Sequence, residues 1–326
     1  MPGHKATDGT ARVSVVVATY NRADRLERLL AGLRAQTLDR AEFEVVIVDD
    51  ASRDRTPEVL AQAQAAGDLD LRVLRHEENR GRATSRQDGW RTARAPLIAF
   101  TDDDCVPAPD WLANGLEACA HSPGAIVQGR TEPDPEEIDR LGPFSRTVRV
   151  PEYDAAFQTC NIFYPREVLE AVGGFDTEAF GRVHGGEDSD LAWRAINRGF
   201  EGVFDERALV HHAVNELGPI GKLRVCAGWD FLAYARHPEL RRAHFATPLF
   251  WKHTHLWLAR ALLGLLLPRR LWPAKLWLAL PWLRSLRARA KLEGGGVAMA
   301  PYYAACDVAE MYAAVRNSVK YRHPML

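Results

Sequence analysis

Short apolar strands alternate with helical segments over the first hundred residues, and this alternation restricts the fold more than any other feature of the sequence. Residues 13–18, 43–48, 71–74 and 97–100 are mostly apolar runs of strand length. The segments between them carry helical patterns, such as the leucines at positions 26, 29, 30 and 33. Units of this kind form a parallel sheet with right-handed crossovers and helices on both faces. The sequence therefore predicts an α/β fold with a mostly parallel, Rossmann-like sheet.

Polar side chains stand where the first, second and fourth strands end. They are Thr19, Tyr20 and Asn21, then Asp49 and Asp50, then Asp102, Asp103 and Asp104. In open sheets of this class ligands bind beyond the carboxyl ends of the strands, so we expect these groups to converge on one crevice. The Tyr20 ring can stack on a base, and the Asp50 carboxylate can accept hydrogen bonds from a base or ribose. The alternative is that Asp49 and Asp50 only cap the next helix.

The three consecutive carboxylates at 102–104 need a compensating charge. Side chains alternate along an extended strand end, which puts Asp102 and Asp104 on one side and Asp103 on the other. Two like charges about 4 Å apart repel by roughly 1 kcal/mol in water and about 4 kcal/mol at an effective dielectric of 20. A divalent cation would supply the missing positive charge. A solvated acidic turn is the alternative.

Four segments together resemble the nucleotide-sugar domain of the family 2 inverting glycosyltransferases, which have the GT-A fold. The segments are 13–22, 48–52, 79–81 and 100–104, and their order and spacing agree with that family. The resemblance covers about residues 12–215. It implies that Tyr20 and Asp50 hold the donor nucleoside. It also implies that Asp102 and Asp104 form a DxD motif, which holds Mg²⁺ or Mn²⁺ on the donor diphosphate.

Further side chains are expected to complete the donor site. Arg86 lies a little over one turn into the third predicted helix, where it can meet a phosphate or Asp50. A surface arginine without such a role is the alternative. The predicted nucleotide-binding set is Thr19, Tyr20, Asn21, Asp50, Arg86 and Asp103.

The acceptor side is predicted from two later stretches. By the resemblance, Asn161 and Glu187 lie near the sugar and acceptor, and Asp188 is the general base. Asp188 would deprotonate the acceptor hydroxyl as its oxygen attacks the anomeric carbon, in a single inverting displacement. Without the resemblance, Asn161 is an ordinary amide at a strand end, and the two acids cap a helix. Asp190 and Arg194 are spaced for a structural i, i+4 ion pair.

Two adjacent histidines, His211 and His212, follow an apolar segment at 200–210 that predicts another strand. Some members of the family place a metal- or phosphate-contacting histidine in this region, and the Val-x-His spacing favours His212 as a metal ligand. Adjacent residues on a strand face opposite ways, so only one of the two can reach the site. A structural histidine at a strand end is the alternative.

The composition changes after residue 215, where we expect the catalytic domain to end. The runs 256–267 and 271–283 are apolar and rich in tryptophan, and each is shorter than the roughly 20 residues that span a bilayer. Residues 256–292 contain basic side chains and no acidic one. We predict that the helical extension 216–326 lies at an anionic membrane surface. Packing on the catalytic domain or on a dimer partner is the alternative.

The rest of the domain organisation follows from the motifs. Residues 1–11 are expected to be a disordered lead-in, because they contain no apolar stretch. The motifs assign 12–107 to a nucleotide-sugar half and 108–215 to an acceptor and catalytic half.

Charge and cysteine content set the remaining limits. The chain has 42 Lys and Arg against 43 Asp and Glu, and this balance gives no sign of a nucleic-acid partner. The five cysteines are widely spaced and contain no CxxC pair, which fits a reducing cytoplasm. We therefore predict a cytoplasmic, metal-dependent transferase, peripheral at the inner face of the plasma membrane. It would move a sugar from a UDP-, dTDP- or GDP-sugar to a hydroxyl of a lipid-linked or cell-envelope glycan.

Other functions remain open from the sequence. The protein can be a soluble transferase that acts on a small molecule or a protein, or a scaffold with a GT-A domain that has lost its activity. Asp49 and Asp50 also resemble the acidic pair of phospho-acceptor receiver domains, but that function leaves the chain beyond about residue 130 unexplained. A sugar nucleotidyltransferase would need a glycine-rich phosphate loop after the first strand, which this sequence lacks.

Overall fold

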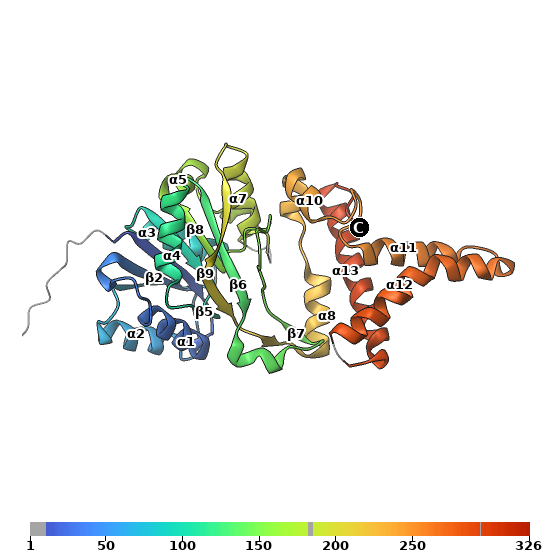
Figure 1. Ribbon diagram of the computed structural model, residues 1–326, viewed down its shortest axis with the longest axis horizontal. Coiled ribbons are helices and arrows are strands. Elements are labelled where there is room, and N and C mark those ends of the chain that lie inside the picture. The colour runs from blue at the N-terminus through green and yellow to red at the C-terminus, as the bar shows by residue number, and fades with distance from the viewer. Residues whose placement is uncertain (1–10, 182–184, 294) are drawn as a thin grey trace, which may run out of the picture. The chain divides into compact units, whose positions relative to one another are not determined.

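The computed structural model describes residues 11–181, 185–293 and 295–326, which form two compact units (Figure 1). Within these residues the first unit comprises 11–138, 147–181 and 187–213, and the second comprises 139–146, 185–186, 214–293 and 295–326. The main part of the second unit begins at residue 214, close to the boundary expected at residue 216. This unit also includes residues 139–146, which the sequence assigns to the acceptor half. Most of the expected lead-in, residues 1–10, lies outside the described residues.

The first unit is built on one eight-stranded sheet, with the strand order β3-β2-β1-β4-β8-β6-β9-β5. The pairs β3–β2, β2–β1, β1–β4 and β6–β9 are parallel, whereas β8 runs antiparallel to β4 and β6, and β5 runs antiparallel to β9. The strands are β1 (Val13–Thr19), β2 (Phe43–Asp49), β3 (Leu71–Arg75), β4 (Leu97–Thr101), β5 (Cys105–Pro107), β6 (Ile126–Pro133), β8 (Asn161–Pro165) and β9 (Gly202–His212).

Helices cover both faces of this sheet, as the apolar strands predict (Figure 1). Adjacent side chains of β1 enter different cores: Val15 packs in one cluster and Val16 in the other. The first cluster takes side chains from α1, α2 and α4, and the second from α3, α5 and α7. The helices are α1 (Ala23–Arg34), α2 (Thr56–Ala66), α3 (Arg82–Thr92), α4 (Trp111–His121), α5 (Arg166–Val172), α6 (Thr177–Phe180) and α7 (Glu187–Ile196), with 3₁₀ turns η1 (Arg40–Glu42) and η2 (Pro135–Arg140).

The second unit is mainly helical, which confirms the expected helical extension. A short antiparallel ribbon joins β7 (Ser145–Arg146) to β10 (Asn215–Glu216). No helix among the described residues is both long enough and apolar enough to cross a membrane. The helices are α8 (Gly218–Gly228), α9 (Leu232–Arg236), α10 (Pro238–His244), α11 (His253–Leu265), α12 (Trp272–Leu292) and α13 (Ala300–Tyr321), with 3₁₀ turns η3 (Arg269–Leu271) and η4 (Val297–Met299).

Candidate active site

The structure brings the polar ends of β1, β2 and β4 together. The backbone N–H of Asp50 donates to the carbonyl of Thr19, with an N···O distance of 2.9 Å. The Thr19 hydroxyl in turn donates to Oδ2 of Asp103 at 2.8 Å. Because β1 is paired in parallel with both β2 and β4, all three ends open at the same edge of the sheet.

Asp50 organises the turn that leads into α3. Its carboxylate accepts hydrogen bonds from the backbone N–H groups of Arg80 and Gly81, both at 2.8 Å, and lies 2.7 Å from Nδ1 of His76. Gly81 has a φ of 85°, and a Cβ at that position would stand 2.4 Å from the carbonyl oxygen of Gly181. The segment 79–81 is therefore folded around Asp50, and glycine is required there.

His76 belongs to this arrangement, although no sequence motif singles it out. Its other ring nitrogen, Nε2, lies 3.1 Å from a carboxylate oxygen of Asp88, so the imidazole stands between two acids. The only sequence signal for His76 is its position directly after β3, whose last residue is paired with Asp49. Nothing in its local sequence indicates the second contact.

Two predicted nucleotide contacts, Tyr20 and Asn21, lie in the loop after β1 and have different surroundings. The side chain of Asn21 is used within the protein, since its Oδ1 accepts from the backbone N–H of Arg53 at 2.7 Å. Asn21 also adopts a left-handed backbone with a φ of 53°. Tyr20, by contrast, has an exposed fraction of 42%. Asn21 therefore fixes the loop, and Tyr20 presents a ring to solvent.

The three acids at 102–104 have different partners. The Arg86 guanidinium donates to Oδ1 of Asp102 at 2.5 Å. Burial favours the neutral acid, but the charges of Arg86, His212 and Arg82 and the hydrogen bond from Arg86 together outweigh it and hold the pKa of Asp102 below its usual range. For Asp103, burial and the neighbouring charge of Asp104 raise the pKa to about 7.

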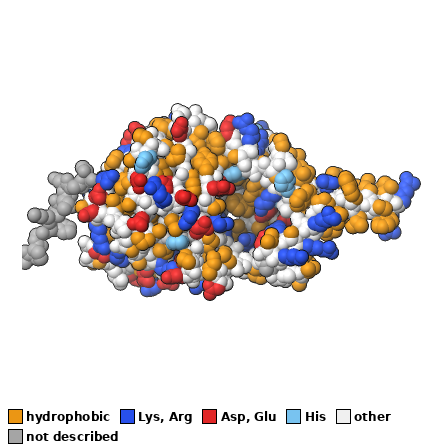
Figure 2. All heavy atoms as spheres, in the orientation of Figure 1, with side chains coloured by type: hydrophobic (Ala, Val, Ile, Leu, Met, Phe, Trp, Pro, Cys, Tyr) orange, Lys and Arg blue, Asp and Glu red, His pale blue; other side chains and the backbone are white. Residues whose placement is uncertain are grey.

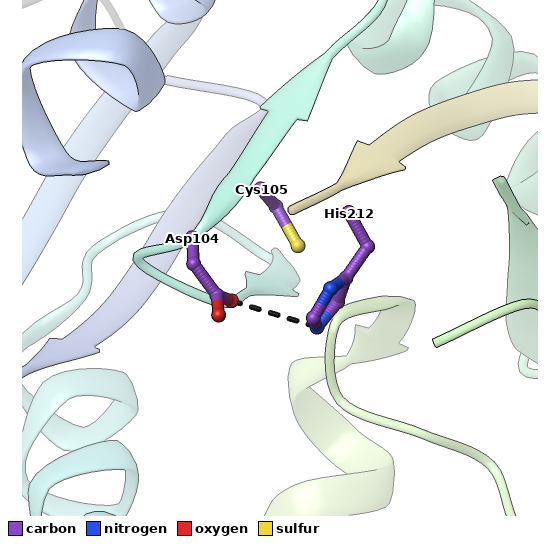
Figure 3. A group of neighbouring side chains, drawn as sticks. All are labelled: Asp104, Cys105 and His212. Atoms are coloured by element: carbon purple, nitrogen blue, oxygen red, sulfur yellow. Dashed lines mark ion pairs between the residues drawn. The ribbon is translucent and has the colours of Figure 1, made fainter. Parts of the chain in front are cut away.

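Asp104 stands beside His212, as Figure 3 shows. Nε2 of His212 lies 3.5 Å from Oδ1 of Asp104, while Nδ1 donates to the carbonyl of Ala213 at 2.9 Å. Antiparallel pairing of β5 with β9 creates this contact, because it sets His212 opposite Cys105. Of the two candidate histidines, His212 is therefore the one that faces the acidic triplet.

The Asp104 and His212 side chains suit a divalent cation. A hydrogen bond from Nδ1 to a carbonyl leaves Nε2 as the free electron pair, which is the usual arrangement of a metal-binding imidazole. Cys105 completes the group of potential ligands, whose atoms lie within 4.8 Å of one another. Burial raises the pKa of the Cys105 thiol well above its usual value, so the sulfur stays protonated. A carboxylate suits Mg²⁺ and Mn²⁺, and the imidazole beside it, without a thiolate, favours the transition metal Mn²⁺ of the two.

Arg86 also reaches the acceptor side. Its second terminal nitrogen donates to Oε1 of Glu187 at 2.9 Å, and the same oxygen lies 2.7 Å from Nε of Arg82. Arg86 is buried on α3, and Glu187 is buried at the start of α7. Arg86 thus meets Asp102 and Glu187 rather than Asp50, and it links the acidic triplet to the predicted catalytic stretch. Arg82 is a further member that no sequence motif identifies.

Asp188 is the neighbour of this buried ion pair. Burial and the adjacent Glu187 raise the pKa of Asp188 to about 7, against the opposing effect of Arg86. Its Oδ1 accepts from the backbone N–H of Ser189 at 2.9 Å, and the side chain remains partly exposed. A partly exposed carboxylate whose pKa lies near neutrality can accept a proton from a hydroxyl.

The predicted ion pair on α7 is confirmed, and it anchors the helix that carries Asp188. Nε of Arg194 lies 2.7 Å from Oδ2 of Asp190. The same guanidinium donates to the carbonyls of Val172 and Gly174, at 2.8 and 2.6 Å. The first turn of α7 is thus held against the turn that follows α5.

Asn161 is buried and fully hydrogen-bonded within the protein. Its Nδ2 donates to the carbonyls of Arg130 and Ala208, at 2.7 and 2.8 Å, and its Oδ1 accepts from Nε1 of Trp111 at 2.8 Å. These bonds tie β8 to β6, β9 and α4. They would have to break before the amide contacts a sugar, so the structure supports the structural alternative for Asn161.

Comparison with known proteins now decides the family. The model of the family described as glycosyl transferase family 2 matches residues 14–174, which contain the ends of β1, β2 and β4. The chain belongs to this family. It is a glycosyltransferase with the GT-A fold, as the motifs predict.

Two curated relatives support the assignment. Glycosyltransferase AglE of Haloferax volcanii is 28% identical over 225 residues, which cover 66% of this chain and 71% of AglE. Validoxylamine A glucosyltransferase of Streptomyces hygroscopicus is 33% identical over 229 residues, which cover 60% of this chain and 53% of the relative. The match thus extends over only about half of that second enzyme.

A solved structure agrees over nearly the whole chain. It is that of mannosyltransferase PcManGT from Pyrobaculum calidifontis in complex with GDP-Man and Mn²⁺, with a TM-score of 0.60 and 26% sequence identity. The match covers 94% of this chain and 87% of PcManGT. The similarity therefore includes residues of the helical extension as well as the sheet.

Proposed function

We propose that this glycosyltransferase moves a sugar from a nucleoside diphosphate to a hydroxyl with inversion, and that it requires Mg²⁺ or Mn²⁺. The observation that carries the proposal is the chain of contacts from Asp102 through Arg86 to Glu187, next to Asp188. It joins a candidate metal and phosphate site to a carboxylate of raised pKa. An inverting displacement needs both groups in one site, with the base and the leaving diphosphate on opposite faces of the anomeric carbon.

In this proposal each part of the site has one task. Asp102, Asp104 and His212 would hold the cation, which would supply positive charge for the departing diphosphate. Asp188 takes the proton of the acceptor hydroxyl. The exposed Tyr20 ring stacks on the base.

The rest of the predicted donor site keeps the strand ends in place. Asp50 orders the turn at 79–81, Asn21 fixes the loop after β1, and the Thr19 hydroxyl orients Asp103. We propose residues 12–107 as the donor half and 108–215 as the acceptor half.

The donor is proposed to be a UDP-, dTDP- or GDP-sugar. PcManGT is in complex with GDP-Man and Mn²⁺ in its solved structure, which supports this class of donor and cation. Glu187 is proposed to face the acceptor. Its Oε2 is buried and has no hydrogen-bond partner among the described residues, so a ligand hydroxyl would satisfy it.

For the acceptor we propose a lipid-linked or cell-envelope glycan, with the enzyme peripheral at the cytoplasmic face of the plasma membrane. The basic, tryptophan-rich segment 256–292 supports this location. A small-molecule acceptor is the second candidate, because one relative is named validoxylamine A glucosyltransferase.

Calorimetry of the full chain with UDP, GDP and dTDP, with and without Mn²⁺, tests the donor site. We expect one nucleotide to bind only with Mn²⁺, and we expect His212→Ala to weaken that binding by at least about tenfold. His211→Ala is the matched control, since this neighbour lies outside the group formed by Asp104, Cys105 and His212. Equal binding by the wild type and His212→Ala would remove His212 from the cation site, and no binding of any nucleotide would contradict the donor proposal.

A further inference from the structure

The hairpin formed by α11, α12 and the turn between them, residues 253–292, has a buried base and an apolar far end. Leu258 on α11 and Leu286 and Ala290 on α12 are buried where the hairpin joins the other helices of its unit. Toward the turn the side chains are exposed: 81% of Leu266 and 65% of both Trp272 and Trp277. Soluble proteins seldom expose neighbouring large apolar side chains unless the patch binds something.

Exposed apolar side chains recur on one face of α12 and at the end of α11. On α12, Trp272, Leu276 and Leu283 are spaced four and seven residues apart and share one face. Leu262 on α11 and Leu266, the residue that follows this helix, stand one turn apart. All five are exposed large hydrophobic residues. The far end of the hairpin thus exposes apolar side chains from both helices and from the turn.

The hairpin carries basic side chains and no acidic ones. No Asp or Glu occurs between residues 240 and 292. Figure 2 shows hydrophobic and basic side chains, without acidic ones, on the visible face of the hairpin's far end. Arg269 and Arg270 are exposed at the turn, and Arg284, Arg287 and Lys291 are exposed near the base.

The exposed apolar side chains and the basic charge together indicate which kind of partner the hairpin binds. A second copy of the chain would oppose the same basic set with itself, because a two-fold interface joins identical patches. An anionic bilayer supplies negative phosphates at its surface and an apolar layer beneath them. Exposed tryptophans and leucines with flanking arginines are the composition of helices that lie in that boundary.

We propose that the hairpin α11–α12 lies along the interface of an anionic membrane. Leu262, Leu266, Trp272, Leu276 and Trp277 enter the acyl boundary, and the basic side chains meet the lipid phosphates. Because arginines stand at both ends of the hairpin, its axis runs along the surface and the turn does not enter the bilayer core. This inference deepens the proposed membrane location, and it does not depend on the donor site.

Sedimentation of the full chain with phosphatidylcholine vesicles, with and without phosphatidylglycerol, tests the inference. We expect binding only to the anionic vesicles, and a loss of at least about tenfold in the double variant Trp272→Ser, Trp277→Ser. The matched control is Tyr312→Ser, Val319→Ser on α13, where the exposed fractions are 60% and 76%. The control should bind as the wild type does.

A second variant keeps the test decisive if the tryptophan variant fails to fold. Arg269→Gln, Arg270→Gln changes two exposed side chains at the turn, and we expect it to lower binding to anionic vesicles by about tenfold. Equal binding by these variants and the wild type would overturn the inference, as would wild-type binding that is independent of phosphatidylglycerol. A lipid-free dimer that the tryptophan variant abolishes would assign the surface to a second copy instead. Unchanged Mn²⁺-dependent nucleotide binding by the variants would separate this result from failure of the donor site.

Discussion

Arg86 joins two acids that lie far apart in the sequence. It contacts Asp102, sixteen positions away, and Glu187, 101 positions away. The helix that carries Arg86 can be predicted from the sequence. The contact with Glu187 cannot, because no local sequence pattern indicates which later segment packs beside this helix. Removing Arg86 takes the buried ion-pair partner from Asp102 and leaves Glu187 with Arg82 alone. Arg86 therefore joins Asp102 at the end of β4 to the first turn of α7.

The raised pKa of Asp188 predicts the pH dependence of the reaction. Burial and Glu187 raise this pKa to about 7, while Arg86 and Arg82 oppose the shift. A general base acts in its ionised form, so kcat/KM should rise with pH through about 7 and then level off. Initial rates at saturating Mn²⁺ across this range measure the profile. A flat profile between about pH 5 and pH 8 would contradict the role of Asp188 as the base.

The same shift predicts an effect on stability. The pKa of Asp188 is raised from 3.8 to about 7, so between these values the folded state binds more protons than the unfolded state. The free energy of unfolding then falls as pH rises, and the loss is complete above about pH 7. Asp188→Asn removes this cost and should raise Tm by about 2 °C or more at pH 8, with less change near pH 4. A variant that melts at or below the wild-type temperature at pH 8 would contradict the pKa shift.

At the scale of elements, β1, β2 and β4 were predictable because each is buried on both faces and is therefore a mostly apolar run. The edge strand β3 is only partly buried and alternates apolar with basic residues. The order of the later strands was not predictable. β8 enters between β4 and β6 and runs against both, and no feature of residues 161–165 indicates this neighbour pair. The pairing of β5 with β9, which brings His212 to Asp104, is likewise a contact between segments more than a hundred residues apart.

The turn into α3 provides a test at this scale. Gly81→Ala should destabilise the chain by about 2 kcal/mol or more, because the φ of 85° is unfavourable for alanine and its Cβ would meet the Gly181 carbonyl at 2.4 Å. Gly67→Ala is the control. Gly67 also has a positive φ, of 65°, but no atom lies within 4 Å of the position that its Cβ would take. We expect a loss of about 1 kcal/mol there. If denaturant unfolding gives the same loss of unfolding free energy for both variants, the contact with the Gly181 carbonyl does not contribute to the cost.

At the scale of the whole molecule, the chain divides into a unit that carries the site and a unit that is mainly helical. The change of composition after residue 215 predicts the second unit, because basic and tryptophan-rich helices replace the alternation of strands and helices. The inclusion of residues 139–146 was not predictable, since only their pairing with 215–216 assigns them there. Motifs identify the chemistry of this protein, whereas long-range pairing determines which of their side chains meet.

The most direct test of the account separates donor binding from transfer. In Asp188→Asn, the Mn²⁺-dependent binding of the donor nucleotide should change by less than about threefold, because Asp188 lies outside the candidate cation group. Release of nucleoside diphosphate from the sugar nucleotide should fall by at least about a hundredfold, because the base is lost. This pair of results would support Asp188 as the base of a metal-dependent transferase. Turnover within tenfold of the wild type would contradict it.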